Sequence, residues 1–206
     1  MPGGKFPKGL KSYAQVRREV RKELNKQQRK NVEVKSEILT GNPSMTNTGV
    51  LVPILQSTIS GTAHDQRVGN RTELLSMNLR IMTALADTGY NNVRYAIIKC
   101  REEPASVSAV FETTSYGTFG SVFASWDYDI VEKVYLDKNV TLNQQVSGAR
   151  ASKFNKHWIK SPMGLHYNTA AANSLQEKLY LVLCSDSAIA PNPGCNYVLR
   201  SRYTDE

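Results

Sequence analysis

The chain lacks the long apolar segments and the cysteine pairs that mark membrane and secreted proteins. Its longest clean apolar run, Leu179–Cys184, is far shorter than the ~20 residues that a membrane-spanning helix needs. The basic, mixed polar beginning of the chain holds no apolar stretch, so we expect no signal peptide. The three cysteines, Cys100, Cys184 and Cys195, are widely spaced and form no CxxC pair. They are therefore predicted to be buried thiols rather than partners in a disulfide.

Recognisable catalytic motifs are lacking as well. The three histidines, His64, His157 and His166, share no metal-ligand spacing, and the chain holds no GxSxG, phosphate loop, GxGxxG or HExxH. Asp127 and Asp129 have the spacing of paired carboxylates on an extended segment, but a surface loop is the better interpretation. We therefore expect a protein that is not an enzyme.

What the chain does have is positive charge concentrated at one end. It carries 26 basic and 18 acidic residues, a net charge of +8. Residues 1–30 hold ten basic residues and two glutamates, which accounts for all +8, whereas 31–206 hold sixteen of each sign. Such a polycation binds polyphosphate by counterion release, without reading base sequence. Residues 1–31, the arm, are therefore predicted to bind nucleic acid through Lys5, Lys8, Lys11, Arg17, Arg18, Arg21, Lys22, Lys26, Arg29 and Lys30.

The arm also has the pattern of an amphipathic helix. Ser12 and Gln15 form a capping box, which predicts a helix from about residue 12 to 29. An apolar stripe recurs at helical spacing, with most basic residues on the opposite side. The stripe is predicted to dock on the body, on copies of itself or on a membrane, although it lacks the Trp or Phe anchors of membrane helices. Alternative roles of the charge are solubility alone and nuclear import. The stripe consists of Tyr13, Val16, Val20 and Leu24.

The remainder of the chain is predicted to be a linker, residues 32–48, and one all-β domain, the body, residues 49–206. Short β-rich runs alternate with turn residues such as Asp137-Lys138-Asn139, and no long helical stretch occurs. About eight strands fit a jelly roll, a sandwich of two sheets, and an up-and-down barrel is the alternative. The candidate strands are Val50–Ser57, Leu74–Leu85, Val93–Arg101, Val107–Thr113, Ile130–Leu136, Asn139–Leu142, Ala151–Ile159, Leu175–Ser185 and Asn196–Tyr203.

Two candidate strands also predict which faces are buried. Leu179–Leu183 is apolar throughout, as a strand buried on both faces would be. Near the C-terminus, apolar and basic residues alternate with a period of two. One face would carry Tyr197, Leu199 and Tyr203, and the other Arg200, Arg202 and Thr204.

Along the chain, a basic amphipathic arm is followed by a linker and then by a neutral body of about eight strands. Three short motifs occur in the body. Gln66–Arg71 is similar to a QR-x-G element that leads into a strand, Asp137–Asn143 resembles a K-D-V-T-L-N strand start, and Tyr203–Glu206 is similar to a Y-T-D ending. On these motifs, from about residue 48 onward, the chain resembles the coat protein of satellite tobacco necrosis virus and the capsid proteins of small circular single-stranded DNA viruses. The arm resembles theirs only in being basic and amphipathic.

The resemblance implies a viral capsid protein, a single jelly roll whose copies tile an icosahedral T=1 shell of about sixty subunits with inward-pointing arms. Such arms would place roughly 480 positive charges around a short single-stranded genome of RNA or DNA. The implied partners are copies of the chain itself, single-stranded nucleic acid and an unidentified host receptor, without a membrane. The implied locations are the virion and the host cell during assembly, with the nucleus as a further site.

The resemblance also implies calcium at subunit contacts. Its ligands would be Asp205 and the backbone carbonyls of Val68 and Arg71. A hard cation usually takes more than one carboxylate. The acidic ligand that the family supplies from its arm region has no clear match, so Asn25 or Glu23 would have to serve here.

The alternative function is a cellular nucleic-acid-binding β-barrel module with a basic tail. Such a module needs exposed aromatic or basic residues on its β surface, where bases stack. Lys153, Lys156 and Lys160 form a candidate patch, although the neutral body favours the coat-protein hypothesis. A jelly-roll enzyme or sugar-binding domain is a third hypothesis, and the lack of clustered histidines and carboxylates disfavours it.

Overall fold

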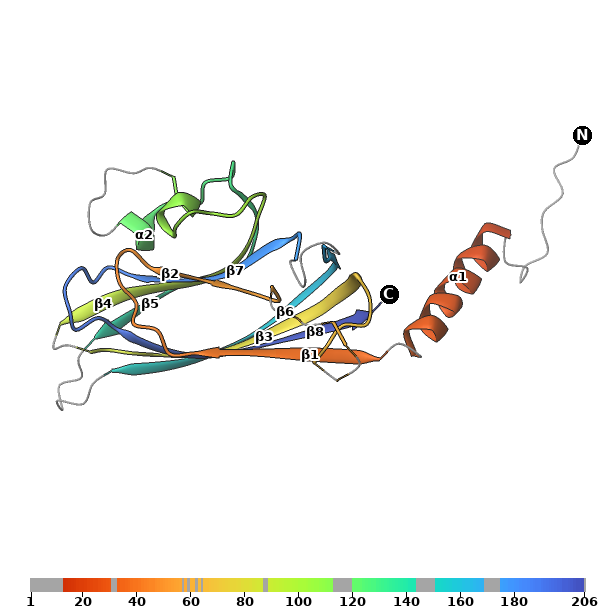
Figure 1. The fold of residues 1–206 in the computed structure, drawn as a ribbon, viewed down its shortest axis with the longest axis horizontal. Coiled ribbons are helices and arrows are strands. Elements are labelled where there is room, and N and C mark those ends of the chain that lie inside the picture. The colour runs from red at the N-terminus through yellow and green to blue at the C-terminus, as the bar shows by residue number, and fades with distance from the viewer. Residues whose placement is uncertain are drawn as a thin grey trace, which may run out of the picture. The chain divides into compact units, whose positions relative to one another are not determined.

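The structure, a computed structural model, divides into two units, Met1–Glu33 and Val34–Glu206, and each is considered by itself. The first unit contains one helix, α1, which spans Tyr13–Lys30 and agrees with the predicted helix to about one residue at each end. Figure 1 shows α1 and the strands of the second unit. The residues that the structure describes are 13–30, 33–56, 58, 60–61, 63, 65–86, 89–112, 120–143, 151–168 and 175–205.

Helix α1 forms because its residues favour helix and nothing in it breaks one. Arg, Lys, Glu, Gln and Leu dominate the sequence YAQVRREVRKELNKQQRK, and neither Gly nor Pro occurs in it. Ser12, the residue expected to cap the helix, lies outside the described residues. The helix is therefore explained by its own composition and by the helical spacing of its apolar residues.

The described part of the second unit contains eight strands in two antiparallel sheets. Their bounds are β1 Val34–Gly41, β2 Val50–Pro53, β3 Arg71–Ala84, β4 Tyr90–Cys100, β5 Val131–Asn143, β6 Ser152–His166, β7 Lys178–Ser185 and β8 Gly194–Asp205. The strand order is β1-β8-β3-β6 in one sheet and β2-β7-β4-β5 in the other. Only one pair of neighbours, β4 and β5, is consecutive in sequence, as in a jelly roll, whereas an up-and-down barrel pairs each strand with the next one along the chain. The predicted all-β jelly roll is confirmed.

Strand β1 corrects the prediction that residues 32–48 are a linker. It pairs with β8 along its whole length, from Val34 opposite Thr204 to Gly41 opposite Tyr197. The sequence pattern concealed it because two of its inward-facing positions are the charged residues Lys35 and Glu37, so apolar and polar residues do not alternate. Among the described residues of the predicted linker, Glu33 and the part beyond Gly41 lie outside β1.

The predicted turn Asp137-Lys138-Asn139 is also wrong, because these residues lie within β5. The two candidate strands on either side of it are one strand, Val131–Asn143, and Asp137 lies opposite Ala96 of β4. The register between β4 and β5 shifts between Ile97 and Ile98. Polar residues here do not end the strand because β5 is the edge strand of its sheet and one of its faces is partly exposed.

The candidate strand Val107–Thr113 is a short helical turn instead. Ser108–Val110 forms a 3₁₀ helix, and only Phe111 makes a β-bridge, to Trp126. Val107, Val110 and Phe111 are all buried, a spacing of three and four that suits a turn of helix better than a strand. The other candidate strands are present with shifted ends.

The main hydrophobic core lies between the two sheets. Leu79, Ile81 and Leu199 from one sheet face Ile97 and Leu181 from the other, and all five are completely buried. The predicted alternation in β8 is confirmed, because Tyr197, Leu199 and Tyr203 share one face and Arg200, Arg202 and Thr204 the other, where Thr204 is nevertheless buried.

A second apolar cluster covers the outer surface of the β2-β7-β4-β5 sheet. Ile98 and Val182 point away from the main core and pack with Val110, Val122 and Trp126 of the connection between β4 and β5. This connection includes a short helix, α2 (Gly120–Phe123), and lies over β4 and β7 (Figure 1). Strand β7 is thus buried on both faces, as its continuous apolar sequence predicts.

The three cysteines are buried, and none of them forms a disulfide. Cys100 and Cys184 belong to the second apolar cluster, and Cys195 to the main core. The prediction of buried thiols is confirmed. Burial raises the pKa of the thiol to about 11 for Cys100 and to about 12 for Cys184 and Cys195.

Candidate nucleic-acid interface

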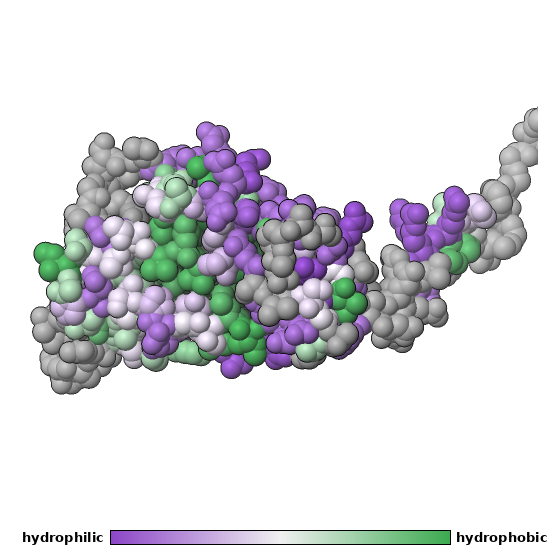
Figure 2. All heavy atoms as spheres, viewed as in Figure 1, coloured by the Kyte–Doolittle hydropathy of each residue, from purple (hydrophilic) through white to green (hydrophobic). Residues whose placement is uncertain are grey.

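The first half of α1 presents four basic side chains to solvent. Arg17, Arg18, Arg21 and Lys22 are all exposed, and no acidic residue occurs in the first turn of the helix. Figure 2 shows hydrophilic and hydrophobic side chains gathered on different sides of the described part of α1. Guanidinium groups bind phosphate through two parallel hydrogen bonds, so such a surface is suited to a nucleic-acid backbone.

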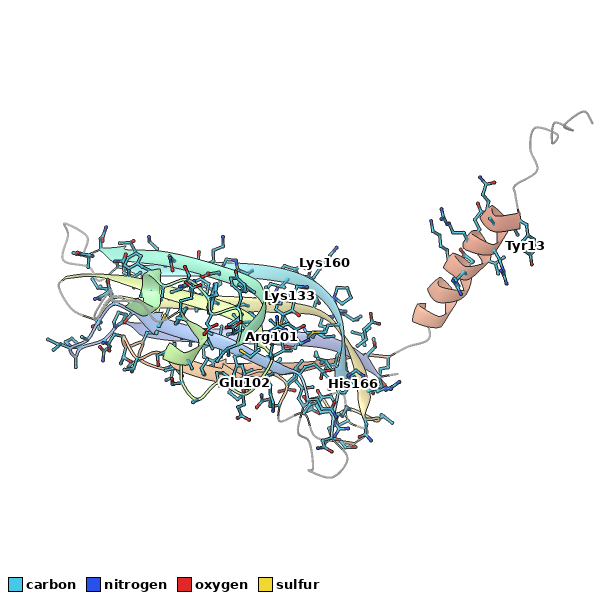
Figure 3. The ribbon with its side chains drawn as sticks, turned by 90° about the horizontal axis from the view of Figure 1, so that it is seen from above. Tyr13, Arg101, Glu102, Lys133, Lys160 and His166 are labelled. Carbon is cyan, nitrogen blue, oxygen red and sulfur yellow. The ribbon has the colours of Figure 1, made fainter. Side chains whose placement is uncertain are left out.

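The apolar stripe of α1 is exposed within the single chain. The exposed fraction is 79% for Tyr13, 44% for Val16 and 52% for Val20. The guanidinium of Arg17 lies 5.7 Å from the centre of the Tyr13 ring, a cation–π contact at the border between the stripe and the basic side. Figure 3 labels Tyr13 at the beginning of the helix. The stripe is therefore available for a partner, as the predicted self-association of arms requires.

The remaining predicted arm residues are only partly covered by the structure. Three of the predicted cations precede α1 and lie outside the described residues: Lys5, Lys8 and Lys11. Five further residues lie in the second half of α1, where the side chains are outside the description: Leu24, Asn25, Lys26, Arg29 and Lys30.

In the body, Asp205 is held by a buried lysine. The Nζ atom of Lys35 lies 2.9 Å from Asp205 Oδ2 and donates a hydrogen bond to the carbonyl of Gln66 at 2.8 Å. The Lys35 side chain is 2% exposed, because β1 directs it inward. The backbone N–H of Val68 donates to the same Asp205 oxygen at 3.2 Å. The QRVGNR segment and the C-terminal Y-T-D motif, far apart in sequence, therefore meet in the structure.

Within a single chain, Asp205 is paired with Lys35 rather than arranged as a calcium ligand. Val68 directs its N–H at Asp205, whereas a calcium ligand would be its carbonyl. The ammonium of Lys35 already neutralises the carboxylate, so a divalent cation would meet a like charge in direct contact with its ligand. Within the described part of the chain, no three His, Cys, Asp or Glu residues are grouped to hold a metal. Calcium bound between subunits, with the backbone carbonyl of Arg71 as one ligand, stays a prediction.

The candidate patch Lys153, Lys156 and Lys160 lies on β6, one of the two edge strands of the β1-β8-β3-β6 sheet. All three side chains are exposed, and Figure 3 labels Lys160 on this strand. Lys156 and Lys160 alternate with two aromatic residues that the sequence analysis did not select, Phe154 and Trp158, which are 67% and 53% exposed. The signal was present in the sequence as a period-two pattern, Phe154, Lys156, Trp158, Lys160.

Comparisons with known proteins assign no family. No protein-family model matches the chain, and no curated protein matches it. Among solved structures, the chain is similar to that of a virus, Desmodium yellow mottle tymovirus, with a TM-score of 0.36 and 10% sequence identity. The similarity covers 84% of this chain and 87% of the other. Within the residues that the structure describes, none of the helices has the length and hydrophobicity to span a membrane. The proposals that follow depend on this chain's own residues.

Proposed function

We propose that the chain is a virus coat protein that assembles into a small closed icosahedral shell and packages a short single-stranded nucleic acid through its arm. One observation carries the proposal: all of the net positive charge lies in residues 1–30, whereas residues 31–206, which include the jelly roll, have a net charge of zero. Within the described part of helix α1, four of these cations, Arg17, Arg18, Arg21 and Lys22, are exposed.

The division of charge suits the two tasks of a coat protein. Identical subunits pack edge to edge many times in a closed shell, and a neutral body does so without net repulsion between copies. A concentrated polycation offsets the phosphate charge of a packaged genome by releasing its counterions. The exposed stripe of Tyr13, Val16 and Val20 gives neighbouring arms a surface for bundling. A T=1 shell of about sixty copies is the arrangement proposed here.

Electron microscopy and analytical ultracentrifugation of the purified full chain test the assembly step. We expect uniform closed particles when single-stranded RNA or DNA is supplied, and a faster-sedimenting species than the monomer. A chain that stays monomeric with nucleic acid present, over a range of protein concentration and salt, would contradict the proposal.

A charge-neutralised variant tests the role of the arm. Arg18→Gln, Arg21→Gln and Lys22→Gln together remove three exposed charges, and glutamine preserves helix propensity. If these side chains bind phosphate, the log–log dependence of affinity on salt concentration becomes shallower by about 2, since each contact to a single strand contributes roughly 0.7. Fluorescence anisotropy with a labelled oligonucleotide measures this dependence.

The matched control removes three exposed charges from the body instead. Arg101, Lys133 and Lys138 are exposed side chains on or next to β4 and β5 (Figure 3 labels the first two), and all three are changed to glutamine. This control is expected to keep the wild-type salt dependence and packaging. Equal effects of the two triple variants would mean that net charge alone matters and that the arm has no special role.

A further inference from the structure

The two sheets of the body differ in how their outer surfaces are covered. The outer surface of β2-β7-β4-β5 is buried under the connection between β4 and β5, with Ile98 and Val182 at 0% exposure. Over the β1-β8-β3-β6 sheet, no described segment provides such a cover. Its outward-facing residues include five of the large hydrophobic side chains that are exposed: Ile38, Met82, Phe154, Trp158 and Val198.

Strand register assembles these residues into one continuous surface. On β6 and β3, Lys156 pairs with Arg80, Trp158 with Asn78 and Phe154 with Met82. On the next strand, β8, Arg200 pairs with Asn78 and Arg202 with Ser76. We call the outward-facing residues from the pair Ser76/Lys160 to the pair Met82/Phe154, with their neighbours on β8 and β1, the sheet face.

The sheet face is strongly positive although the body as a whole is neutral. It carries Arg80, Lys156, Lys160, Arg200 and Arg202, and none of its outward-facing residues on the four strands is acidic. A partner that binds the sheet face is therefore expected to be anionic, because a neutral or positive partner would leave these charges uncompensated. A second copy of the same face is disfavoured because five cations would meet five cations.

The aromatic residues specify what kind of anion. Phe154 and Trp158 are four residues apart on one strand, so their side chains lie on the same face about 13 Å apart with Lys156 between them. A groove of about 740 Å³ runs beside Phe154 and is lined by Arg80, Met82 and Val198. Flat apolar surfaces that alternate with cations are the pattern that holds single-stranded nucleic acid, since bases stack on the rings while phosphates contact the cations.

We infer that the sheet face binds single-stranded nucleic acid, with bases stacked on Trp158 and Phe154 and phosphates at Lys156 and Arg80. The inference rests on the proposed function only for the class of ligand, and it does not require shell assembly or the arm. Duplexes are excluded as the preferred ligand because their bases are already stacked on one another and present no free ring face.

Tryptophan fluorescence tests stacking directly in the full chain. The chain has two tryptophans, and Trp126 is 6% exposed with its indole N–H donated to Asp137 at 2.8 Å. Quenching by a ligand therefore reports on Trp158. An oligothymidylate of about twelve nucleotides, within the site sizes known for such proteins, is compared with an abasic oligonucleotide of equal length. The first is expected to quench and the second is not, although both carry the phosphates that the arm needs.

The double variant Phe154→Ala, Trp158→Ala tests the affinity. It is expected to weaken oligothymidylate binding by about fivefold to 150-fold per stacked base, and to leave binding of the abasic oligonucleotide unchanged. Tyr90→Ala is the control, because Tyr90 is 67% exposed on the other sheet and should leave both affinities unchanged. Protection of the three buried cysteines from alkylation shows that each variant is folded.

The outcomes separate this inference from the proposed function. In one outcome, removal of the arm charge abolishes binding of both oligonucleotides, while the double variant binds like the wild type. This outcome would overturn the inference and leave the proposed function intact. A double variant that alters only the oligomeric state would also overturn it, since the sheet face would then be a contact between copies. Base-dependent quenching by a chain that never assembles would support the inference while the coat-protein proposal fails.

Discussion

Arg94 and Asp137 form a two-point ion pair between neighbouring strands β4 and β5. Arg94 donates from Nε and Nη2 to the two carboxylate oxygens of Asp137, at 2.9 and 2.6 Å. The guanidinium also lies 4.4 Å from the centre of the Trp126 ring and donates to the carbonyl of Ala124 at 2.7 Å. One buried arginine therefore fastens the connection between β4 and β5 to the outer surface of its sheet.

Arg94→Ala is expected to destabilise the body by about 2–4 kcal/mol, since breaking a buried pair leaves its partner uncompensated and Asp137 retains partial exposure. Denaturant unfolding followed by tryptophan fluorescence measures the change. Lys99→Ala is the control, because the pair between Lys99 and Glu132 lies on the same two strands but is more exposed. Its loss should cost less than about 1 kcal/mol, and equal costs for the two variants would contradict the special role of Arg94.

Lys35→Met keeps most of the apolar stem and removes the ammonium that neutralises Asp205. We expect a loss of about 3 kcal/mol in the free energy of unfolding, since the carboxylate keeps only the N–H of Val68 as a donor among the contacts above. The double variant with Asp205→Asn should recover part of this loss, as a double-mutant cycle would reveal.

Calcium is expected to leave the unfolding midpoint of the unassembled wild-type chain unchanged, because the Lys35 ammonium already lies 2.9 Å from Asp205. Thermal unfolding with calcium and with a chelator measures this directly. A calcium-dependent rise in the unassembled chain would mean that one subunit completes a metal site, and a rise confined to assembled particles would place the metal between subunits.

Glu37 predicts a pH dependence of stability. Burial raises the pKa of its carboxyl above the ordinary 4.5, and the charge of Asp65 adds to this, while a hydrogen bond from Thr58 opposes it. The folded chain therefore holds this proton to higher pH than the unfolded chain, and the stability that the proton contributes is lost as pH rises through the raised pKa. Glu37→Gln should be more stable than the wild type at pH 7, with a difference that shrinks as pH falls through the raised pKa toward 4.5 and stays constant below it.

Unfolding midpoints of wild type and Glu37→Gln across this pH range provide the measurement, and Glu112→Gln at an exposed position is the control. The control should follow the wild-type profile. A wild type that is as stable as Glu37→Gln at neutral pH would contradict an unfavourable burial of the Glu37 carboxylate.

The cysteines provide a reporter of the folded state. Because burial raises their pKa values to about 11 and about 12, and their side chains have little exposed surface, all three should resist alkylation at pH 8. Mass spectrometry before and after addition of denaturant is expected to show no modification and then three modifications. Rapid labelling of the native chain would contradict the packing of the cluster that contains Cys100 and Cys184.

The parts of the fold that local sequence pattern determines were predicted well. Helix α1 follows from helix-forming residues and a stripe at helical spacing, and β8 from the alternation of Tyr197, Leu199 and Tyr203 with polar and basic residues. Strand β1 was missed because Lys35 and Glu37 face inward, where each finds a partner from a distant part of the chain, Asp205 and Thr58. No local pattern reports a partner of that kind.

The sequence by itself determined the segregation of charge, the all-β class of the body and the helical arm, because each depends on composition or on neighbours a few residues away. Only the tertiary structure decided that Asp137 lies within a strand rather than a turn, since Arg94 neutralises it from the next strand. It also decided that Trp158, Arg80 and Arg200 share one surface, because strand register joins residues from three separate parts of the chain.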